Sequence, residues 1–125
     1  MNSITLKPKL TELYTLNKFI SDELPKENHQ VNLIVEEVFV NIVNYSKTDF
    51  VTVNVEYENK TLVLEFIDNG IEFNPLLKKN PNIPKSIDEA QIGGLGIFLA
   101  KKMSDEIYYH NINGENHLKI IKKVK

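Results

Sequence analysis

The sequence predicts an α/β (α+β) two-layer sandwich, in which a mixed, mostly antiparallel sheet is covered on one face by three helices. Two observations support this fold. β-Branched runs come in pairs separated by two-residue turns, and longer apolar stretches repeat with the period of a helix. The chain has 125 residues, of which 42% are hydrophobic and 26% charged. These values are typical of one globular domain, so we expect a single domain over residues 1–125.

The N-terminal part of the chain predicts one strand followed by two helices. Residues 2–7 alternate as in a short strand, and Pro8 is suited to the first turn of a helix that extends to about Leu24. Pro25 then ends this helix. A second helix is expected over residues 27–45, and it is apolar around most of its circumference.

Two hairpins are expected to supply the remaining strands. One turns at Asn59-Lys60 and the other at Asn113-Gly114, and both turns lie between apolar, β-branched runs. The predicted strands are 49–58, 61–68, 106–112 and 117–124.

A loop and a third helix separate the two hairpins. Residues 80–84 hold two prolines and two asparagines, which predicts a loop over residues 76–91. Loops of this length in compact domains are usually functional or disordered. Residues 93–104 follow as a helix.

Charge and composition exclude some classes of function. The chain has 15 basic and 17 acidic residues and a net charge of −2, which argues against electrostatically driven binding to nucleic acid. All the basic residues are lysines, so phosphate contacts must come from backbone amides or from ammonium groups. The sequence has no cysteine, no signal-peptide pattern and no run near the ~20 apolar residues of a membrane span. We therefore expect a cytoplasmic protein without membrane contact.

Polar side chains form a narrow stripe on the apolar helix at 27–45. Glu37, Asn41 and Asn44 fall within roughly 60° of one another at about 100° per residue. Buried polar groups need partners, so these side chains either meet protein donors or face a polar cavity. A hydrogen-bonded pair at a solvent edge is equally compatible with the pattern alone, and Glu36 is expected to be such an edge residue.

A second group follows the apolar strand at 61–68. Asp68 can accept a hydrogen bond from an exocyclic amine, and Gly70 allows a flat ring to approach the backbone. The alternative is an ordinary Asn-Gly turn. We favour the binding site because no alternating strand follows within hairpin distance.

A glycine-rich segment opens the helix at 93–104. Its residues are Gly93, Gly94, Leu95, Gly96 and Ile97, and free amides at a helix N-terminus bind anions such as a triphosphate. The segment matches neither the P-loop nor the dinucleotide fingerprint, and glycines that merely end a loop are the alternative. Together the three groups offer oxygen ligands for a hard cation, an acid for an adenine amine and amides for phosphates.

These three segments resemble the sequence boxes of the GHKL ATPases, and most closely those of the anti-sigma factor serine kinases of the RsbW and SpoIIAB type. Residues 37–41 resemble the N box, residues 68–75 the first glycine box, and residues 93–103 the second. The resemblance covers about residues 4–123. It implies the Bergerat fold, with ATP and Mg²⁺ bound between helices and sheet under an ATP lid at about 76–92.

The resemblance also implies roles for single residues. Asn41 would be the Mg²⁺ ligand, Glu37 the base that takes a proton from the attacking serine hydroxyl, Asp68 the adenine acceptor, and Gly70 the glycine against the ring. The residues that it assigns to the cofactor are Asn41, Asn44, Asp68, Gly70, Ile71, Gly93, Gly94, Leu95, Gly96 and Ile97.

The function implied is an ATP-dependent protein serine/threonine kinase and anti-sigma factor in a partner-switching circuit. Its implied partners are a STAS-domain anti-sigma factor antagonist, which it phosphorylates, a sigma factor or similar effector, and a second copy in a homodimer. About 26 residues precede the N-box helix, so a complete sensor histidine kinase is not expected. The alternatives are an ATP-binding module that sequesters a partner without phosphoryl transfer, and a small α/β enzyme or scaffold without nucleotide.

The sequence departs from relatives at three places. Tyr45 stands where relatives often carry a basic residue, and Glu115-Asn116-His117 stands where many carry a threonine that assists at the adenine. The lid contains no arginine. In relatives, a lid arginine can contact the phosphates or the partner, and here that contact would fall to the ammonium groups of Lys78, Lys79 or Lys85.

Overall fold

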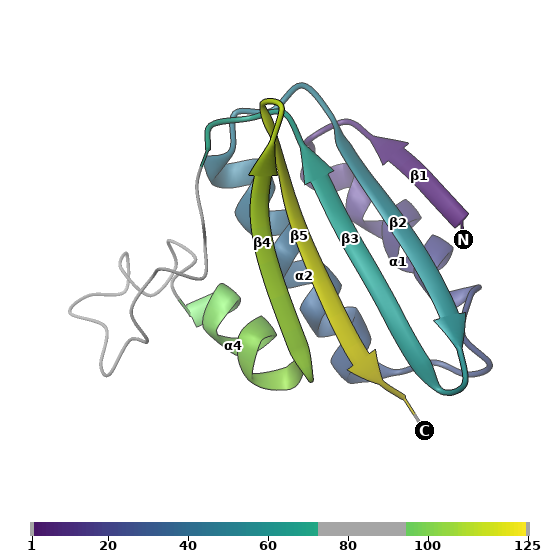
Figure 1. Cartoon of the computed structure of the whole chain (residues 1–125). Coiled ribbons are helices and arrows are strands. Elements are labelled where there is room, and N and C mark those ends of the chain that lie inside the picture. Colours follow the sequence, from purple (N-terminus) through teal and green to yellow (C-terminus); the bar gives the residue numbers. More distant parts are fainter. Residues whose placement is uncertain (1, 73–94, 125) are drawn as a thin grey trace.

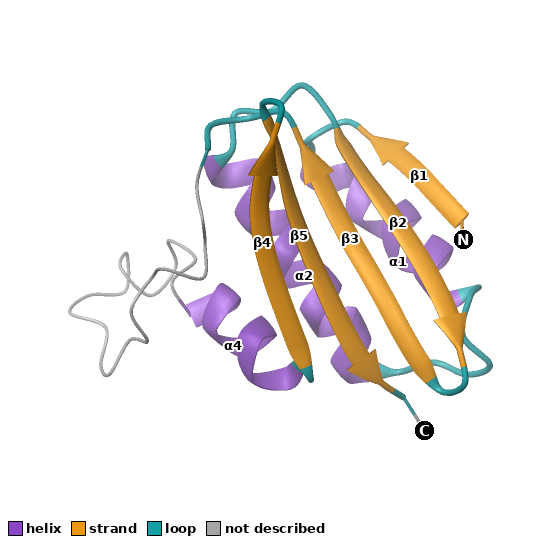
Figure 2. Cartoon of the chain, in the orientation of Figure 1, coloured by secondary structure: helices purple, strands orange, loops and turns teal. Residues whose placement is uncertain are grey.

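The computed structural model describes residues 2–72 and 95–124, which form a sheet with helices packed on one face (Figure 1). The two-layer prediction is confirmed, as Figure 2 shows by element type. The sheet has five strands in the order β1-β2-β3-β5-β4. The four pairings between these strands are antiparallel, so no parallel pair occurs among them. The strands are β1 (Asn2–Leu6), β2 (Val51–Glu58), β3 (Thr61–Asp68), β4 (Glu106–Ile112) and β5 (Glu115–Lys123).

The N-terminal helical segment starts later and ends earlier than predicted. It consists of a 3₁₀ turn η1 (Leu10–Glu12) and an α-helix α1 (Leu13–Ser21). Pro8 lies in a tight turn in which the Lys9 amide donates to the Lys7 carbonyl at 2.8 Å. Lys9 is extended, with φ −130° and ψ 138°, so a helix cannot begin at Pro8. The amide of Asp22 still donates to the carbonyl four residues back, whereas those of Glu23 and Leu24 donate to carbonyls three residues back, so the α-helix ends there in short turns.

Helix α2 (His29–Tyr45) is the longest described helix and lies behind the centre of the sheet (Figure 1). Asn28 caps its N-terminus, because its Oδ1 accepts a hydrogen bond of 3.0 Å from the Val31 amide. This cap explains why the helix begins at His29 rather than at Glu27. Its apolar face is completely buried against the sheet and comprises Val31, Ile34, Val35, Val38, Phe39 and Ile42.

Helix α4 (Leu95–Met103) packs against α2 near the β4 edge of the sheet (Figure 1). Its described part starts at Leu95, and Gly93 and Gly94, with which the predicted helix begins, lie outside the described residues. The predicted loop at 76–91 and lid at 76–92 also lie outside them. Among the described helices, none is long and apolar enough to cross a membrane.

Both predicted hairpin turns are confirmed. Asn59 and Lys60 have φ values of 52° and 62°, and Asn113 and Gly114 have values of 52° and 80°. Positive φ at both central residues defines a turn whose twist matches that of the flanking strands. Because the second turn occupies only Asn113 and Gly114, β5 begins at Glu115 rather than at the predicted 117.

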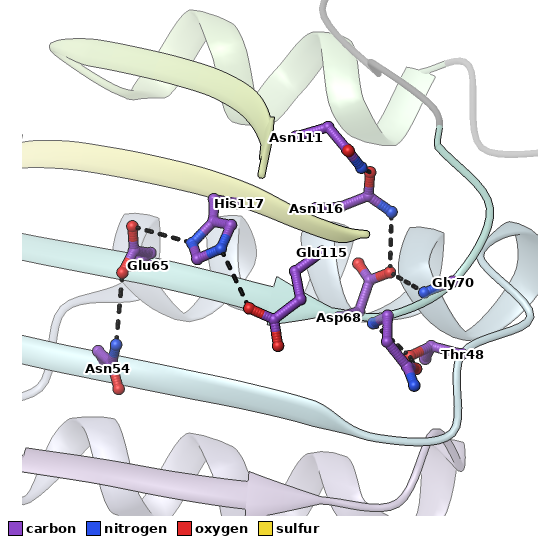
Figure 3. A network of polar contacts seen from close by, with 10 residues as sticks. Thr48, Asn54, Glu65, Asp68, Gly70, Asn111, Glu115, Asn116 and His117 are labelled. Atoms are coloured by element: carbon purple, nitrogen blue, oxygen red, sulfur yellow. Dashed lines mark hydrogen bonds and ion pairs between the residues drawn. The ribbon is translucent and has the colours of Figure 1, made fainter. Parts of the chain in front are cut away.

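Alternate residues of the strands build the core, because successive side chains of a strand point to opposite faces. The helix-facing residues of the three inner strands are nearly inaccessible: Val51, Val53, Val55, Leu62, Leu64, Phe66, Leu118 and Ile120. The opposite face of the sheet carries mostly polar side chains, with Tyr108 and Ile112 exposed among them. There His117 stacks on His110 with ring centroids 5.0 Å apart, and its two nitrogens lie 3.5 Å from Glu65 and Glu115 carboxylate oxygens (Figure 3).

Candidate functional site

The polar stripe of α2 contains a buried amide with an unpartnered oxygen. Asn41 is only 7% exposed, and its Oδ1 has no hydrogen-bond partner among the described residues. Glu37, one turn earlier, is half-buried, whereas Glu36 and Asn44 are exposed. A hydrogen-bonded pair at a solvent edge therefore does not describe Asn41, since a buried oxygen without a partner is costly unless a ligand completes it.

The environment of Glu37 favours proton uptake. Burial raises the pKa of the Glu37 carboxyl above its ordinary value, and the negative charge of Glu36 raises it further. A carboxylate with a raised pKa is a stronger base than an exposed glutamate. This is the property that a proton acceptor near neutral pH requires.

A cleft opens between α2 and the adjoining ends of β3, β5 and β4. The cleft itself has a volume of about 30 Å³, and the space between its walls, with the open solvent included, amounts to about 400 Å³. Its walls are apolar with a few polar groups, which is typical of small-molecule sites. The apolar side chains are Val38, Ile42, Phe66, Ile71 and Leu118, and the polar residues are Asn41, Tyr45, Ser46, Asp68, Tyr109 and Asn116.

Among the described residues, Asp68 is the only acid that lines this cleft, and it is 5% exposed. Its Oδ1 accepts three hydrogen bonds. Two come from the Gly70 amide at 2.9 Å and Asn116 Nδ2 at 3.0 Å (Figure 3), and the third comes from Ser46 Oγ at 2.5 Å. Among the described residues, no hydrogen bond reaches Oδ2. The carboxylate therefore has one fully engaged oxygen and one that is available as an acceptor.

The structure shows a reason for a glycine at position 70 that differs from the predicted contact with a ring. A Cβ at this position would lie 2.0 Å from both the backbone oxygen and the hydroxyl of Ser46. The absent side chain lets the next residue, Ile71, donate its amide to the Ser46 carbonyl at 2.7 Å. Gly70 thus joins the end of β3 to the end of α2. Ile71 lines the cleft, and its contact with the cofactor stays a prediction.

Asn69 is a structural residue of the same turn. Its Oδ1 accepts hydrogen bonds from Thr48 Oγ1 at 2.6 Å and from the Asp49 amide at 2.9 Å, and its own amide donates to Thr48 Oγ1 at 2.9 Å. These contacts anchor the turn after β3 to the loop between α2 and β2. They therefore fix the backbone that carries the Asp68 carboxylate.

Sequence reasoning missed three polar residues of the cleft, Ser46, Tyr109 and Asn116. Asn116 lies directly opposite Asp68 in the pairing of β3 with β5. The hairpin patterns alone did not reveal that these two strands are neighbours. Once the order of the strands is known, the register identifies Asn116 at once.

The predicted phosphate-binding residues are only partly within the described chain. Leu95, Gly96 and Ile97 form the first turn of α4, whereas Gly93, Gly94 and the lysines at 78, 79 and 85 lie outside the described residues. The amides of a first helical turn have no partner within the helix. An anion site at this end of α4 stays a prediction.

The described residues fit a magnesium ion held jointly with phosphates. They contain no group of three or more histidine, aspartate or glutamate side chains that could hold a metal by themselves. Mg²⁺ often takes only one or two protein oxygens and completes its shell with water and substrate phosphates. The unpartnered Asn41 Oδ1 is one such oxygen, and Glu37 supplies a carboxylate one turn away.

Comparisons with known proteins identify the family of the chain. Residues 8–122 match the family described as the histidine kinase-like ATPase domain. The serine/threonine-protein kinase BtrW of Bordetella bronchiseptica is 27% identical over 92 residues, which are 70% of this chain and 65% of the relative. The chain thus spans somewhat less than two thirds of that relative's length.

A solved structure supports the fold. The histidine kinase AdeS of Acinetobacter baumannii aligns with a TM-score of 0.57 and 12% identity, over 100% of this chain and 68% of that one.

An ATPase domain implies ATP binding, and the family match extends over most of the chain, including the cleft. The chain therefore belongs to the family of histidine kinase-like ATPase domains.

Proposed function

We propose that the chain is an ATP-dependent protein serine/threonine kinase and anti-sigma factor of a partner-switching circuit. It would phosphorylate a STAS-domain antagonist, bind a sigma factor or similar effector, and act as a homodimer in the cytoplasm. The observation that carries the proposal is the unpartnered, buried Asn41 Oδ1 in the same cleft as Asp68. The likeness to a serine/threonine kinase supports the choice of reaction.

Residues of the cleft, together with Glu37 one turn before Asn41 on α2, would divide the work of phosphoryl transfer. Asp68 Oδ2 accepts a hydrogen bond from the adenine amine, and the apolar walls exclude water from the base. Asn41 Oδ1 would hold Mg²⁺, which would neutralise charge on the phosphates. Glu37 accepts the proton of the substrate serine. The serine oxygen then forms a bond to the γ-phosphorus, the bond to the bridging oxygen breaks, and ADP leaves.

The experiment that tests this proposal is phosphate transfer from ATP labelled in the γ-phosphate to purified STAS-domain proteins. Wild type is expected to label a serine or threonine of one of them. Glu37→Gln keeps the shape of the side chain but removes the base, so we expect transfer to fall by about a hundredfold or more with ATP binding retained. Glu56→Gln, an exposed position on β2, is the matched control and should transfer at the wild-type rate.

The alternative function is an ATP-binding module that sequesters its partner without phosphoryl transfer. The lack of arginine in the whole chain favours it, because phosphoryl-transfer sites commonly use guanidinium to stabilise the transferring group. If wild type and Glu37→Gln both bind ATP and neither labels a STAS-domain protein, the kinase proposal fails and the module remains. If wild type binds no ATP, both are wrong.

A further inference from the structure

Asn116 connects the acid of the cleft to its surroundings. It is 6% exposed and lies opposite Asp68 across the pairing of β3 and β5. Its Nδ2 donates to Asp68 Oδ1 at 3.0 Å (Figure 3) and to the Ile71 carbonyl at 2.9 Å. One amide nitrogen thus fixes both the carboxylate and the loop that leaves β3.

The oxygen of the same amide is held from the neighbouring strand. Asn116 Oδ1 accepts hydrogen bonds from Tyr109 OH at 2.5 Å and from Asn111 Nδ2 at 3.1 Å, both on β4. A carboxamide offers two donor hydrogens and one oxygen with two lone pairs, and all four are in use here. A flipped amide would set its oxygen against Asp68 Oδ1 and the Ile71 carbonyl, so only one orientation is compatible with these partners.

This arrangement assigns different tasks to the two residues. Asn116 has no hydrogen-bonding capacity left for a ligand. Asp68 Oδ1 is also saturated, by Ser46, Gly70 and Asn116, which leaves Oδ2 as the atom that a base can reach. Ser46, Gly70 and Asn116 come from three different parts of the fold, so the direction of the carboxylate depends on their joint placement.

We propose that Asn116, itself held by Tyr109, is the positioning residue that makes this cleft selective for a purine with a 6-amino group. By engaging Asp68 Oδ1 it presents Oδ2 as a pure acceptor, which accepts the amine of adenine and repels the 6-carbonyl of guanine or hypoxanthine. This inference rests on the proposed function only in that the cleft must bind ATP.

The test compares ATP with purine riboside 5′-triphosphate, which lacks the 6-amino group but keeps the ring and the phosphates. Dissociation constants are measured by titration calorimetry with the full chain. For wild type we expect ATP to bind about tenfold more tightly or better, the usual effect of a hydrogen bond to a charged group. In Asn116→Leu the affinity for ATP should fall about tenfold, while that for the analogue changes less than twofold.

Two further variants make the result decisive. Tyr109→Phe removes only the hydroxyl that holds Asn116, and we expect it to lower the ratio of ATP to analogue affinity about threefold. Asn54→Leu makes the same change as Asn116→Leu on the polar face of the sheet, where Asn54 contacts Glu65, and should leave the ratio unchanged. Circular dichroism verifies folding, and if Asn116→Leu does not fold, Tyr109→Phe decides alone.

The outcomes separate this inference from the proposed function. A fall in the ratio in Asn116→Leu or Tyr109→Phe supports the positioning role, whether or not the protein transfers phosphate. An equal loss of affinity for both nucleotides, or an unchanged ratio, would mean that Asn116 is merely structural and would overturn the inference. If wild type binds neither nucleotide, the proposed function and the inference are both wrong.

Discussion

Gly70 illustrates how one absent side chain holds the site together. The turn after β3 approaches the end of α2 so closely that a Cβ at Gly70 would overlap the Ser46 carbonyl oxygen at 2.0 Å. A backbone oxygen in a hydrogen bond to the Ile71 amide cannot rotate away. The close approach also places Ser46 Oγ within 2.5 Å of Asp68 Oδ1.

We expect Gly70→Ala to lower the free energy of unfolding by about 1–3 kcal/mol, the usual cost of forcing extra volume into a packed site. Gly114→Ala is the matched comparison, because it meets no heavy atom within 4 Å but has a φ of +80°. It should cost about 1 kcal/mol from backbone strain alone. Urea unfolding measures both, and a smaller loss for Gly70→Ala than for Gly114→Ala would contradict the steric explanation.

Glu37 gives the stability of the protein a defined dependence on pH. Its folded-state pKa is raised above the ordinary value of 4.5, first by burial and then by the charge of Glu36. At pH values between 4.5 and the raised pKa, the folded protein therefore binds more protons than the unfolded chain. By linkage, this contribution to stability is present below the window and is lost as pH rises through it.

Glu37→Gln removes this titration. We expect the variant to be more stable than wild type at pH 7, where wild type holds a partly desolvated charge, and the difference to shrink as pH falls below 4.5. Urea unfolding of both proteins at pH 7 and pH 4 measures the difference. Glu56→Gln is the control at an exposed position, and a gain of the same size and pH dependence there would refute the assignment to Glu37.

At the scale of elements, α2 supports the site because it carries both Glu37 and Asn41. Its first turn depends on the Asn28 side chain, whose oxygen accepts the Val31 amide at 3.0 Å. Asn28→Ala leaves that amide without a partner, so we expect a loss of about 1 kcal/mol in unfolding free energy. Asn28→Asp keeps an accepting oxygen and should cost much less. Chemical denaturation compares the two, and an equal loss in both would exclude the cap as the cause.

Elements that are specified by residues close together in the sequence could be predicted from it. The turns at Asn59-Lys60 and Asn113-Gly114 were correct, because residues that tolerate positive φ lie between β-branched runs. The start of α1 was wrong, because Pro8 suits a tight turn as well as a first helical turn. The pattern of α2 located Glu37 and Asn41 on one stripe, but it could not tell that Asn44 is exposed, since burial depends on what packs nearby.

At the scale of the whole molecule, the cleft exists only where distant segments meet. Asp68 and Asn116 are 48 residues apart in sequence, and no local pattern specifies that β3 and β5 are neighbours. The sequence therefore predicted the acid but not the amide that positions it. It also predicted the sandwich, because the hydrophobic periods of helices and strands are local properties.

Binding of Mg-ATP is expected to stabilise the whole fold. At a hundredfold excess over the dissociation constant, the unfolding free energy should rise by about 2.7 kcal/mol, which differential scanning fluorimetry detects as a higher melting temperature. Removal of Mg²⁺ by a chelator should reduce this gain. Asn41→Leu replaces an unpartnered buried amide by an apolar side chain, so we expect the protein without ligand to keep its stability but to lose the Mg²⁺-dependent part of the gain.

The control for this experiment is Asn54→Leu, which lies on the other face of the sheet and should respond to Mg²⁺ like wild type. An Asn41→Leu protein that still gains the full Mg²⁺-dependent stability would show that another residue holds the ion.

The pairing of β3 with β5 also bears on how the protein becomes functional during synthesis. A growing chain that has emerged only through β3 possesses the acid of the cleft, but β5, whose Asn116 donates to this acid, is made later. Premature termination before β5 would consequently yield a polypeptide with its helix α2 and its first hairpin, yet without a receptor for the nucleotide.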